Sequence, residues 1–394
     1  MPDSTGIQFV AGQGGNLEKP IDEHPLDEVL AFYQSLPDYA PTPLIALDRL
    51  ATHLGLERIW VKDEGRRFGL KAFKAMGATY GLCRALAARL DIEARPLTLA
   101  ALANPSLAPR LAQITCITAT DGNHGRAVAW AAHRIGCRAV VYMPRGTAQA
   151  RIDNVRMFGA TVEIIDGNYD QAVALAAEAA QKHDWLLIQD TIGEGCEQVA
   201  RWIMDGYRIL VRECLDALDG VAPTHVVLQA GVGSFAGAIQ AELMARLGGR
   251  RPHTTIVEPA RAACFYQSAL AGDGRTRQAE GDLKTIMAGL ACGVPNPLAR
   301  EILWPSADLF TACADRVTRR GMRVLGNPLE GDPAVISGES GAVGLGLVYE
   351  AMTDRRLAGL KRAMGLAPSS RVLVFSTEAD TDPVMYRQVV WGGR

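Results

Sequence analysis

The chain has 394 residues, of which 48% are hydrophobic and 21% charged, and its formal net charge is −2. This length and composition predict a globular protein of two domains or of one large domain. The nearly neutral charge argues against a protein whose main task is to bind nucleic acid, because neutralising phosphates requires an excess of Lys and Arg.

The sequence predicts no membrane-spanning helix and no secretory signal. Its longest uncharged stretches are shorter than about 18 residues and are interrupted by Gly or Pro. The N-terminus lacks a basic segment followed by an apolar one. Eight cysteines without a C-x-x-C spacing indicate neither a disulfide framework nor a zinc site. We therefore expect a cytoplasmic protein of the size of an enzyme, with no bound metal, no membrane contact and no nucleic-acid partner.

The first predicted element is an early helix with a lysine at its head. Lys74 precedes the small-residue segment AMGATYGLCRALAARL and has Phe73 beside it. A lysine that is desolvated by apolar neighbours has a lowered pKa and becomes nucleophilic. The alternative is an ordinary solvated surface lysine. Lys71 is a competing candidate, on the same face if the helix covers both residues.

Strands and helices alternate through the middle of the chain. We expect strands at 115–119, 139–143, 161–165 and 185–189, with helices at 125–135, 150–158 and 169–182 between them. A loop or short helix is expected at 95–110. Such alternation with short connections implies right-handed crossovers and a mostly parallel sheet.

The alternation resumes after a boundary that we expect near residues 193–196. A long helix is predicted at 197–218, followed by a strand at 225–229, a helix at 238–247, a strand at 255–257 and a final strand at 371–375. The predicted fold class is therefore α/β, with two open lobes that each contain a mostly parallel sheet.

Thr120–Gly125 (TDGNHG) lies between a predicted strand and the N-terminus of a predicted helix. Backbone N–H groups at such a turn lie beside the positive end of the helix dipole and suit a carboxylate or phosphate. Asp121 and Asn123 would point into the crevice at the carboxyl ends of the strands. The alternative is an Asx-Gly turn that only caps the helix, with Asp121 as the cap.

A glycine-rich segment, Gly231–Gly237 (GVGSFAG), also follows a strand and precedes a helix. Successive N–H groups of such a loop form an anion-binding concavity. The segment equally matches the dinucleotide fingerprint G-x-G-x-x-G/A, with Glu258 as a candidate ribose-binding acid. Its late position in the chain argues against a dinucleotide. A third interpretation is a turn that only allows close packing of helix on strand.

Further candidates lie at strand ends. Asp190 follows one strand, where an aspartate can be catalytic or can bind backbone. Ser376-Thr377 ends the last strand, where a hydroxyl could face a ligand or begin a turn. Cys264 and Cys292 flank a polar, Gly-rich stretch, and we expect two buried thiols there rather than a disulfide.

Together these segments resemble the fold type II family of pyridoxal-phosphate enzymes, which includes threonine and serine dehydratases. The resemblance rests on Phe73-Lys74, Gly122-Asn123, Gly231–Ser234 and Ser376-Thr377, which occur in the order typical of the family. Within it, the chain is similar to the diaminopropionate ammonia-lyases through segments such as AFKAMGATY, ATDGNHGRAVAWAA, MAGLACG, ISGESGAVGLG and FSTEADTDPVMYRQVVWGG. Lys71 departs from the uncharged residue, such as Asn, expected there, and would change the charge of the pocket.

The resemblance implies a large cofactor-binding domain (residues 1–85 and 195–394) and a small domain (residues 86–194) that carries the substrate-binding Asn turn, with the active site between them. Lys74 would bind pyridoxal 5'-phosphate covalently, and Asn123 would hydrogen bond the hydroxyl on its ring. Thr377, or Ser376, would face the pyridine nitrogen. The phosphate would be held by Gly231, Val232, Gly233 and Ser234.

The activity implied is α,β-elimination of 2,3-diaminopropionate to pyruvate and two molecules of ammonia, by a homodimer. Lys74 would remove the α-proton of the L isomer. Asp121 could bind the β-ammonium group, or remove the α-proton of the D isomer from the opposite face. Asp190 would assist the leaving amine, and Thr120 and His124 would contact the amino-acid substrate.

Three alternatives stay open at the level of sequence. A serine, threonine or hydroxyaspartate dehydratase would use the same scaffold, and Asp121 is the feature that argues for a diamino acid instead. A nicotinamide-dependent oxidoreductase would leave Phe73-Lys74 and the Asn turn unexplained. A non-catalytic binding protein would need no reactive lysine.

Overall fold

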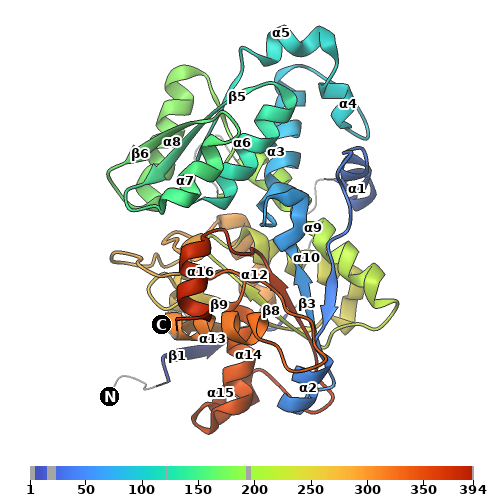
Figure 1. Cartoon of the computed structure of the whole chain (residues 1–394), viewed down its shortest axis with the longest axis vertical. Coiled ribbons are helices and arrows are strands. Elements are labelled where there is room, and N and C mark those ends of the chain that lie inside the picture. Colours follow the sequence, from blue (N-terminus) through green and yellow to red (C-terminus); the bar gives the residue numbers. More distant parts are fainter. Residues whose placement is uncertain (1–4, 16–23, 121, 192–196, 393–394) are drawn as a thin grey trace. The chain divides into compact units, whose positions relative to one another are not determined.

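The computed structural model describes residues 5–15, 24–120, 122–191 and 197–392 (Figure 1). The chain divides into two compact units, one formed by residues 1–21, 42–66 and 211–394 and the other by residues 22–41 and 67–210. Each unit is built around its own largely parallel sheet, as the predicted fold class requires.

The larger unit contains a seven-stranded sheet in the order β1-β10-β9-β8-β11-β3-β2. The five central strands are parallel: β10 (Leu309–Cys313), β9 (His253–Pro259), β8 (His225–Gln229), β11 (Arg371–Ser376) and β3 (Arg58–Asp63). The edge strands β1 (Ile7–Ala11) and β2 (Leu44–Ala46) are antiparallel to their neighbours. All five residues of β10 are buried, as expected for a parallel strand that is covered on both faces.

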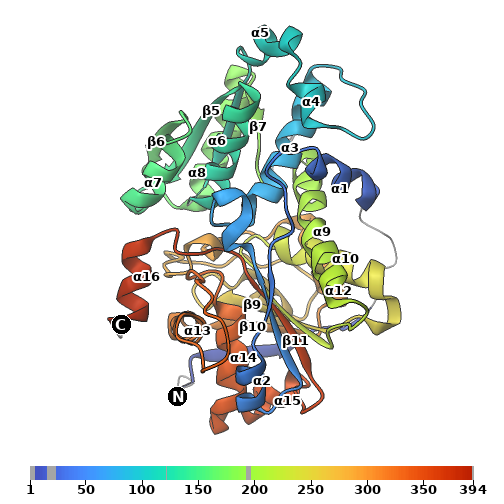
Figure 2. The ribbon, with the colours of Figure 1, turned by 45° about the vertical axis from the view of Figure 1, so that its right-hand side comes forward.

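Helices cover this sheet and complete the core of the larger unit. Helix α14 (Val343–Thr353) contacts β8, β9 and β11, and α13 (Asp315–Gly326) packs on α14 (Figure 2). Helix α10 (Ser234–Leu247) contacts β8 and packs against α12 (Pro297–Ser306). The remaining helices of this unit are α2 (Asp48–Leu54), α11 (Cys264–Ala271), α15 (Ala358–Ala363) and α16 (Pro383–Val390).

The smaller unit contains a four-stranded parallel sheet in the order β6-β5-β4-β7. Its strands are β4 (Thr115–Ala119), β5 (Arg138–Pro144), β6 (Thr161–Ile165) and β7 (Leu186–Leu187). Alanines of α8 (Tyr169–His183) pack against Ile117, Ala119 and Val140 on one face. Side chains alternate along a strand, so Cys116 and Thr118 point to the other face. Helix α6 (Asn123–Ile135) contacts β4 and β5 and packs on α3 (Lys74–Arg89).

The other helices of the smaller unit are α1 (Leu26–Gln34), α4 (Leu99–Leu102), α5 (Ala108–Leu111) and α7 (Gln149–Arg156). Helix α9 (Glu197–Leu218) begins in this unit and ends in the larger one. The short helices α4 and α5 confirm the expectation for residues 95–110. The strand predicted at 185–189 is shorter than expected, and β1, β2, β3 and β10 were not predicted.

The predicted domain limits differ from the division that the structure shows. Residues 24–41, 67–85 and 197–210 belong to the smaller unit, whereas the sequence assigned them to the larger domain. The reason is the close packing of α3 on the first half of α9, where a Cβ on Gly77 would lie 2.5 Å from the Tyr207 ring. The boundary expected at residues 193–196 lies outside the described residues.

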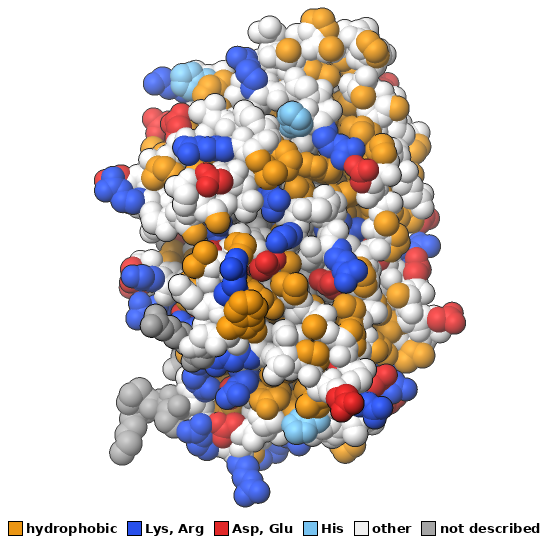
Figure 3. Space-filling view, in the orientation of Figure 1, with side chains coloured by type: hydrophobic (Ala, Val, Ile, Leu, Met, Phe, Trp, Pro, Cys, Tyr) orange, Lys and Arg blue, Asp and Glu red, His pale blue; other side chains and the backbone are white. Residues whose placement is uncertain are grey.

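Two surface properties bear on the kind of protein. No helix in the described ranges is both long and apolar enough to cross a membrane. On the face drawn in Figure 3, basic and acidic side chains are interspersed, in line with the small net charge.

Candidate active site

Lys74 and Asp190 are brought together in the smaller unit. Lys74 is the first residue of α3, and its ammonium group forms an ion pair with the Asp190 carboxylate. The Lys74 side chain is 18% exposed and that of Asp190 only 2%. The Lys74 Nζ also lies 5.3 Å from the centroid of the Phe73 ring. The predicted lysine is therefore largely withdrawn from solvent and has a charged partner.

Electrostatics favour the ionised form of Asp190. Burial alone would raise the pKa of its carboxyl group, but the Lys74 ammonium and His124 outweigh burial and hold that pKa below its usual range. A carboxylate that stays ionised beside Nζ stabilises the charged form of the lysine. The pair therefore holds two opposite charges together in a largely buried place.

His124 and Tyr207 line the same region. The His124 ring is buried, and its Nε2 lies 2.8 Å from the Ile188 carbonyl oxygen. Burial lowers the pKa of His124 and raises that of Tyr207, with Lys74 close to both. Within the described residues, His124 Nδ1 has no hydrogen-bond partner, whereas the Tyr207 hydroxyl interacts with the Lys74 side chain. A buried polar atom normally has a hydrogen-bond partner, so a ligand or a water molecule is expected beside His124 Nδ1.

The Asn turn has the predicted location. Thr120 is buried, and its Oγ1 accepts a hydrogen bond from the Gly122 N–H at 2.9 Å. Asn123 is the first residue of α6, and the N-cap residue Gly122 has no side chain with which to cap the helix. Asp121 lies outside the described residues. Lys71 has a backbone φ of +58° and precedes α3, so the two lysines do not share a helix face.

In the larger unit, the glycine-rich segment connects β8 to α10. Gly233 has a φ of +91°, and a Cβ there would lie 2.4 Å from Phe265 Cζ. Close packing therefore accounts for part of the glycine requirement. Gly233 is also the N-cap of α10, so no side chain covers the first N–H groups of that helix, and such groups suit a phosphate.

A buried asparagine holds the residue that begins α10. Asn296 Nδ2 donates to Ser234 Oγ at 2.7 Å, and Asn296 Oδ1 accepts from Leu298 N at 3.0 Å. Asn296 is fully buried. The sequence did not indicate this residue, whose Asn-Pro context is typical of a simple helix start.

The two hydroxyls at the end of β11 differ in their hydrogen bonds. Thr377 Oγ1 accepts from Gln229 Nε2 at 3.0 Å, which leaves the Thr377 proton for another acceptor. Ser376 Oγ donates to the Glu378 carbonyl at 3.4 Å. This difference favours Thr377 as the residue that faces a ligand. Gln229, the last residue of β8, was not predicted.

Two other sequence candidates have structural roles. Glu258 is buried and accepts hydrogen bonds from Phe265 N and Tyr266 N, at 2.9 and 2.7 Å, so it caps α11. An acid engaged in this way is poorly placed to bind a ribose, which argues against the nicotinamide alternative. Cys264 and Cys292 are both buried thiols, as expected. No three metal-binding side chains gather in the part of the chain that is described.

Comparison with known proteins decides the family. The family described as "Pyridoxal-phosphate dependent enzyme" matches residues 36–368. The chain belongs to this family of pyridoxal-phosphate dependent enzymes. Among them it is 45% identical over 371 residues to the diaminopropionate ammonia-lyase of Salmonella typhimurium, a match that covers 93% of this chain and 92% of that one.

Solved structures of pyridoxal-phosphate dependent enzymes agree with this assignment. The diaminopropionate ammonia lyase of Escherichia coli, in complex with an aminoacrylate-PLP azomethine reaction intermediate, matches with a TM-score of 0.91 and 42% identity, over 99% of this chain and 98% of that one. A threonine deaminase from Solanum lycopersicum, 20% identical over 96% of this chain and 97% of its own, has a TM-score of 0.68 and shows the shared fold. The expected fold type II architecture is thus confirmed.

The residues present fit pyridoxal phosphate. A largely buried lysine can form a covalent bond to an aldehyde, and the uncapped N-terminus of α10 can hold a phosphate. A threonine hydroxyl with an available proton can donate to a pyridine nitrogen.

Proposed function

We propose that this enzyme catalyses the α,β-elimination of 2,3-diaminopropionate to pyruvate and two molecules of ammonia. The observation that carries the proposal is the pairing of a largely buried Lys74 with a buried, ionised Asp190. This pair provides an amine that can bind the cofactor and a carboxylate that stabilises the positive charge on that amine. The 45% identity to a diaminopropionate ammonia-lyase supports the choice of substrate.

Residues of both units would hold the cofactor. Lys74 would bind it covalently, and the segment Gly231–Ser234, including Val232 and Gly233, would hold its phosphate through backbone N–H groups and the Ser234 hydroxyl. Asn123 would hydrogen bond the ring hydroxyl, and Thr377 would donate to the ring nitrogen. When bound, the cofactor supplies an electron-withdrawing ring that acidifies the substrate α-carbon.

The protein's own groups would then move the protons. Lys74 Nζ takes the α-proton of the L isomer, and Asp190 keeps a carboxylate beside Nζ and assists protonation of the leaving amine. A neutral Thr377 hydroxyl stabilises a charged ring less than a carboxylate would, which favours prompt loss of the β-substituent. Thr120 and His124 are proposed substrate contacts, and the orphaned His124 Nδ1 is the atom suited to that role.

Asp121 has a separate proposed role. A carboxylate in the Asn turn would bind the β-ammonium group of the substrate, or remove the α-proton of the D isomer. The enzyme would therefore act on the L isomer and also on the D isomer. We further infer, from the resemblance to the family, a homodimer that works in the cytoplasm.

Spectra and product assays test these roles together. The purified protein should show the visible absorbance band of a lysine-bound pyridoxal cofactor and release pyruvate from D- and L-2,3-diaminopropionate, with little product from serine or threonine. Lys74→Ala should abolish both the band and pyruvate formation, whereas the control Lys71→Ala should keep the band. Asp121→Asn should keep the band and slow turnover, most for the D isomer.

Three results would contradict parts of the proposal. Product from hydroxyamino acids alone would replace the substrate with that of a dehydratase. An absorbance band that is retained in Lys74→Ala but lost in Lys71→Ala would show that the cofactor is bound to Lys71 and not to Lys74. Unchanged rates of Asp121→Asn on both isomers would remove that residue from the mechanism.

A further inference from the structure

Three thiols of the smaller unit lie close to one another and have no part in the proposed elimination. Cys83 belongs to α3, Cys116 to β4, and Cys137 immediately precedes β5. Cys83 and Cys116 are fully buried, whereas Cys137 is partly exposed. Interactions among these thiols affect the pKa of Cys116, with Cys137 as the dominant partner.

The register of the sheet explains why Cys116 and Cys137 are neighbours. Cys116 lies directly opposite Ala139 in the parallel pair β4·β5. Cys137 is two residues before Ala139, and side chains two residues apart along an extended chain point to the same face. The two cysteines are therefore diagonal neighbours on one face of the sheet. Gly136, which precedes Cys137, is the C-cap residue of α6, and the N–H groups of both residues donate to the Ala132 carbonyl at 2.9 Å.

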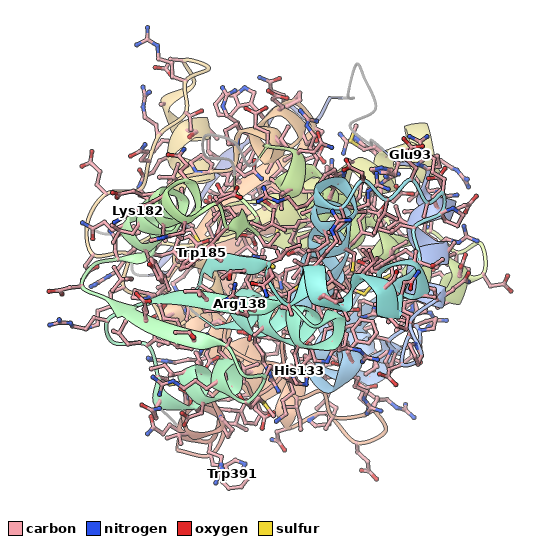
Figure 4. The ribbon with its side chains drawn as sticks, turned by 90° about the horizontal axis from the view of Figure 1, so that it is seen from above. Glu93, His133, Arg138, Lys182, Trp185 and Trp391 are labelled. Carbon is pink, nitrogen blue, oxygen red and sulfur yellow. The ribbon has the colours of Figure 1, made fainter. Side chains whose placement is uncertain are left out.

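Cys137 is accessible through a cavity of about 540 Å³. The cavity is lined by residues that begin or precede the strands of this sheet, among them Thr115, Thr161 and Trp185. Its wall also includes His133 and Arg138, which Figure 4 labels together with Trp185. It thus lies at the amino ends of the strands, whereas the Asn turn lies at the carboxyl end of β4.

We propose that Cys116 and Cys137 are an oxidisable thiol pair, which a peroxide reaching Cys137 through this cavity converts to a disulfide. The Cys137 sulfur attacks one peroxide oxygen, the O–O bond breaks, and a sulfenic acid and water form. The Cys116 sulfur then attacks the Cys137 sulfur, the S–O bond breaks, and a second water leaves. The two thiols lose two hydrogens, and hydrogen peroxide is reduced to two waters.

Proton affinities agree with this division of roles. Interaction with the Cys116 thiol lowers the pKa of Cys137, against the opposing effect of burial. The pKa of Cys116 is raised by its interaction with Cys137 and by burial. Burial also raises the pKa of Cys83. The accessible thiol is therefore the one most easily ionised, as expected of the attacking sulfur, and Cys116 is the resolving thiol.

The disulfide would constrain the segment that carries the Asn turn. Residues 116–137 include the end of β4, Asn123 and the whole of α6. A bond between the two ends of this segment would tie β4 to the start of β5. Oxidation at the cavity would thus affect the segment that holds Asn123, one of the proposed cofactor residues, without a direct contact to that side chain.

Peptide mapping of the oxidised holoenzyme tests the pair directly. Trypsin separates Cys83 (residues 75–84), Cys116 (residues 111–126) and Cys137 (residues 135–138) into three peptides. After brief treatment of the reduced holoenzyme with hydrogen peroxide, we expect the loss of two thiols. We also expect a cross-linked pair of peptides 111–126 and 135–138, which dithiothreitol separates.

Variants define the specificity of the reaction. Cys116→Ser and Cys137→Ser should each abolish the cross-link, and Cys313→Ser, which removes a buried thiol of the larger unit, should keep it. A cross-link from peptide 75–84, over-oxidation of Cys137 without a disulfide, or no loss of thiols would overturn the proposal. The map of the unmodified sequence decides the question even if a serine variant folds poorly.

Discussion

Burial of individual titratable side chains makes the stability of this protein depend on pH in a defined direction. Burial lowers the pKa of His124 in the folded protein. Below about pH 6.5 this histidine therefore binds a proton in the unfolded chain more readily than in the folded protein. Stability therefore falls as the pH drops from about 6.5 towards the folded pKa. The pKa of Asp190 is lowered in the folded protein, so the ionised Asp190 carboxylate contributes to stability above about pH 3.9. This contribution is lost as the pH falls from there towards the folded pKa.

The contribution of His124 can be isolated by substitution. Urea unfolding at pH 7.5 and pH 5.5 should show a smaller loss of stability in His124→Asn than in the natural sequence, by up to about 1.4 kcal/mol per pH unit. His53→Asn, at an exposed position, is the control and should leave the loss unchanged. An equal loss in all three proteins would mean that His124 is not the group that resists protonation.

A buried ion pair in the larger unit should be costly to break from one side. The Lys62 ammonium pairs with Glu213 and also donates to the Thr42 carbonyl at 2.7 Å, and both charged side chains are almost fully buried. Lys62→Met would leave the Glu213 carboxylate buried without its cation, at a loss of about 3–5 kcal/mol in the free energy of unfolding.

An exposed ion pair of the same unit supplies the comparison. Arg212 and Asp216 are 32% and 62% exposed, and Arg212→Met should cost less than about 1 kcal/mol. Denaturant unfolding measures both variants. Equal losses would show that burial does not set the strength of the Lys62 interaction.

The candidate site residues that the sequence indicated have a local signature, and those that it did not indicate depend on tertiary contacts. Lys74, Asn123 and the Gly231–Ser234 loop lie in recognisable motifs beside helix starts. Tyr207 and Gln229 carry no such signal, because an aromatic residue in a helix and a glutamine ending a strand have many ordinary explanations. Their relevance follows only from the interaction of the Tyr207 hydroxyl with Lys74 and from the hydrogen bond that Gln229 donates to Thr377.

At the scale of single elements, the contact of α3 with α9 should tolerate no added side chain. A Cβ on Gly77 would lie 2.5 Å from Tyr207 Cε1 and 2.6 Å from Ile203 Cγ2. Gly77→Ala should therefore destabilise the protein by about 1–3 kcal/mol through overpacking, although alanine is the better helix former.

The matched control is Gly249→Ala, because a Cβ on Gly249 would meet no atom within 4 Å. Thermal unfolding should show a clear decrease for Gly77→Ala and little change for Gly249→Ala. A Gly77→Ala protein as stable as the Gly249→Ala control would indicate that α3 and α9 can move apart without a loss of stability.

The strands that were not predicted, such as β3, differ from the predicted ones in their local sequence pattern. β3 ends in Lys62 and Asp63, whose charge suggests a surface loop, yet both residues are buried. The charge of Lys62 is neutralised by a residue 151 positions away, which no local pattern reveals. In contrast, β4, β6 and β8 follow their apolar runs and were predicted with the correct bounds.

For the whole molecule, removal of the cofactor should lower stability if residues of both units bind it. Ligand binding to the folded state alone adds about 2.7 kcal/mol when the ligand is present at 100 times its dissociation constant. The apoenzyme should therefore unfold at a lower temperature than the holoenzyme, and added pyridoxal phosphate should restore the higher unfolding temperature.

Hydrogen exchange locates this effect. Amide protons in the first turns of α3 and of α10 should both exchange more slowly in the holoenzyme. Protection in only one of these helices would mean that the cofactor engages a single unit, contrary to the proposed function.

The pairing of β1 with β10 has a consequence for synthesis on the ribosome. β1 comprises residues 7–11, and its partner comprises residues 309–313; β3 likewise pairs with β11, near the C-terminus. The smaller unit, by contrast, is complete once residue 210 has emerged. A nascent chain can thus fold this unit first, whereas β1 and β3 can pair only after residues 309–313 and 371–376, respectively, have been synthesised.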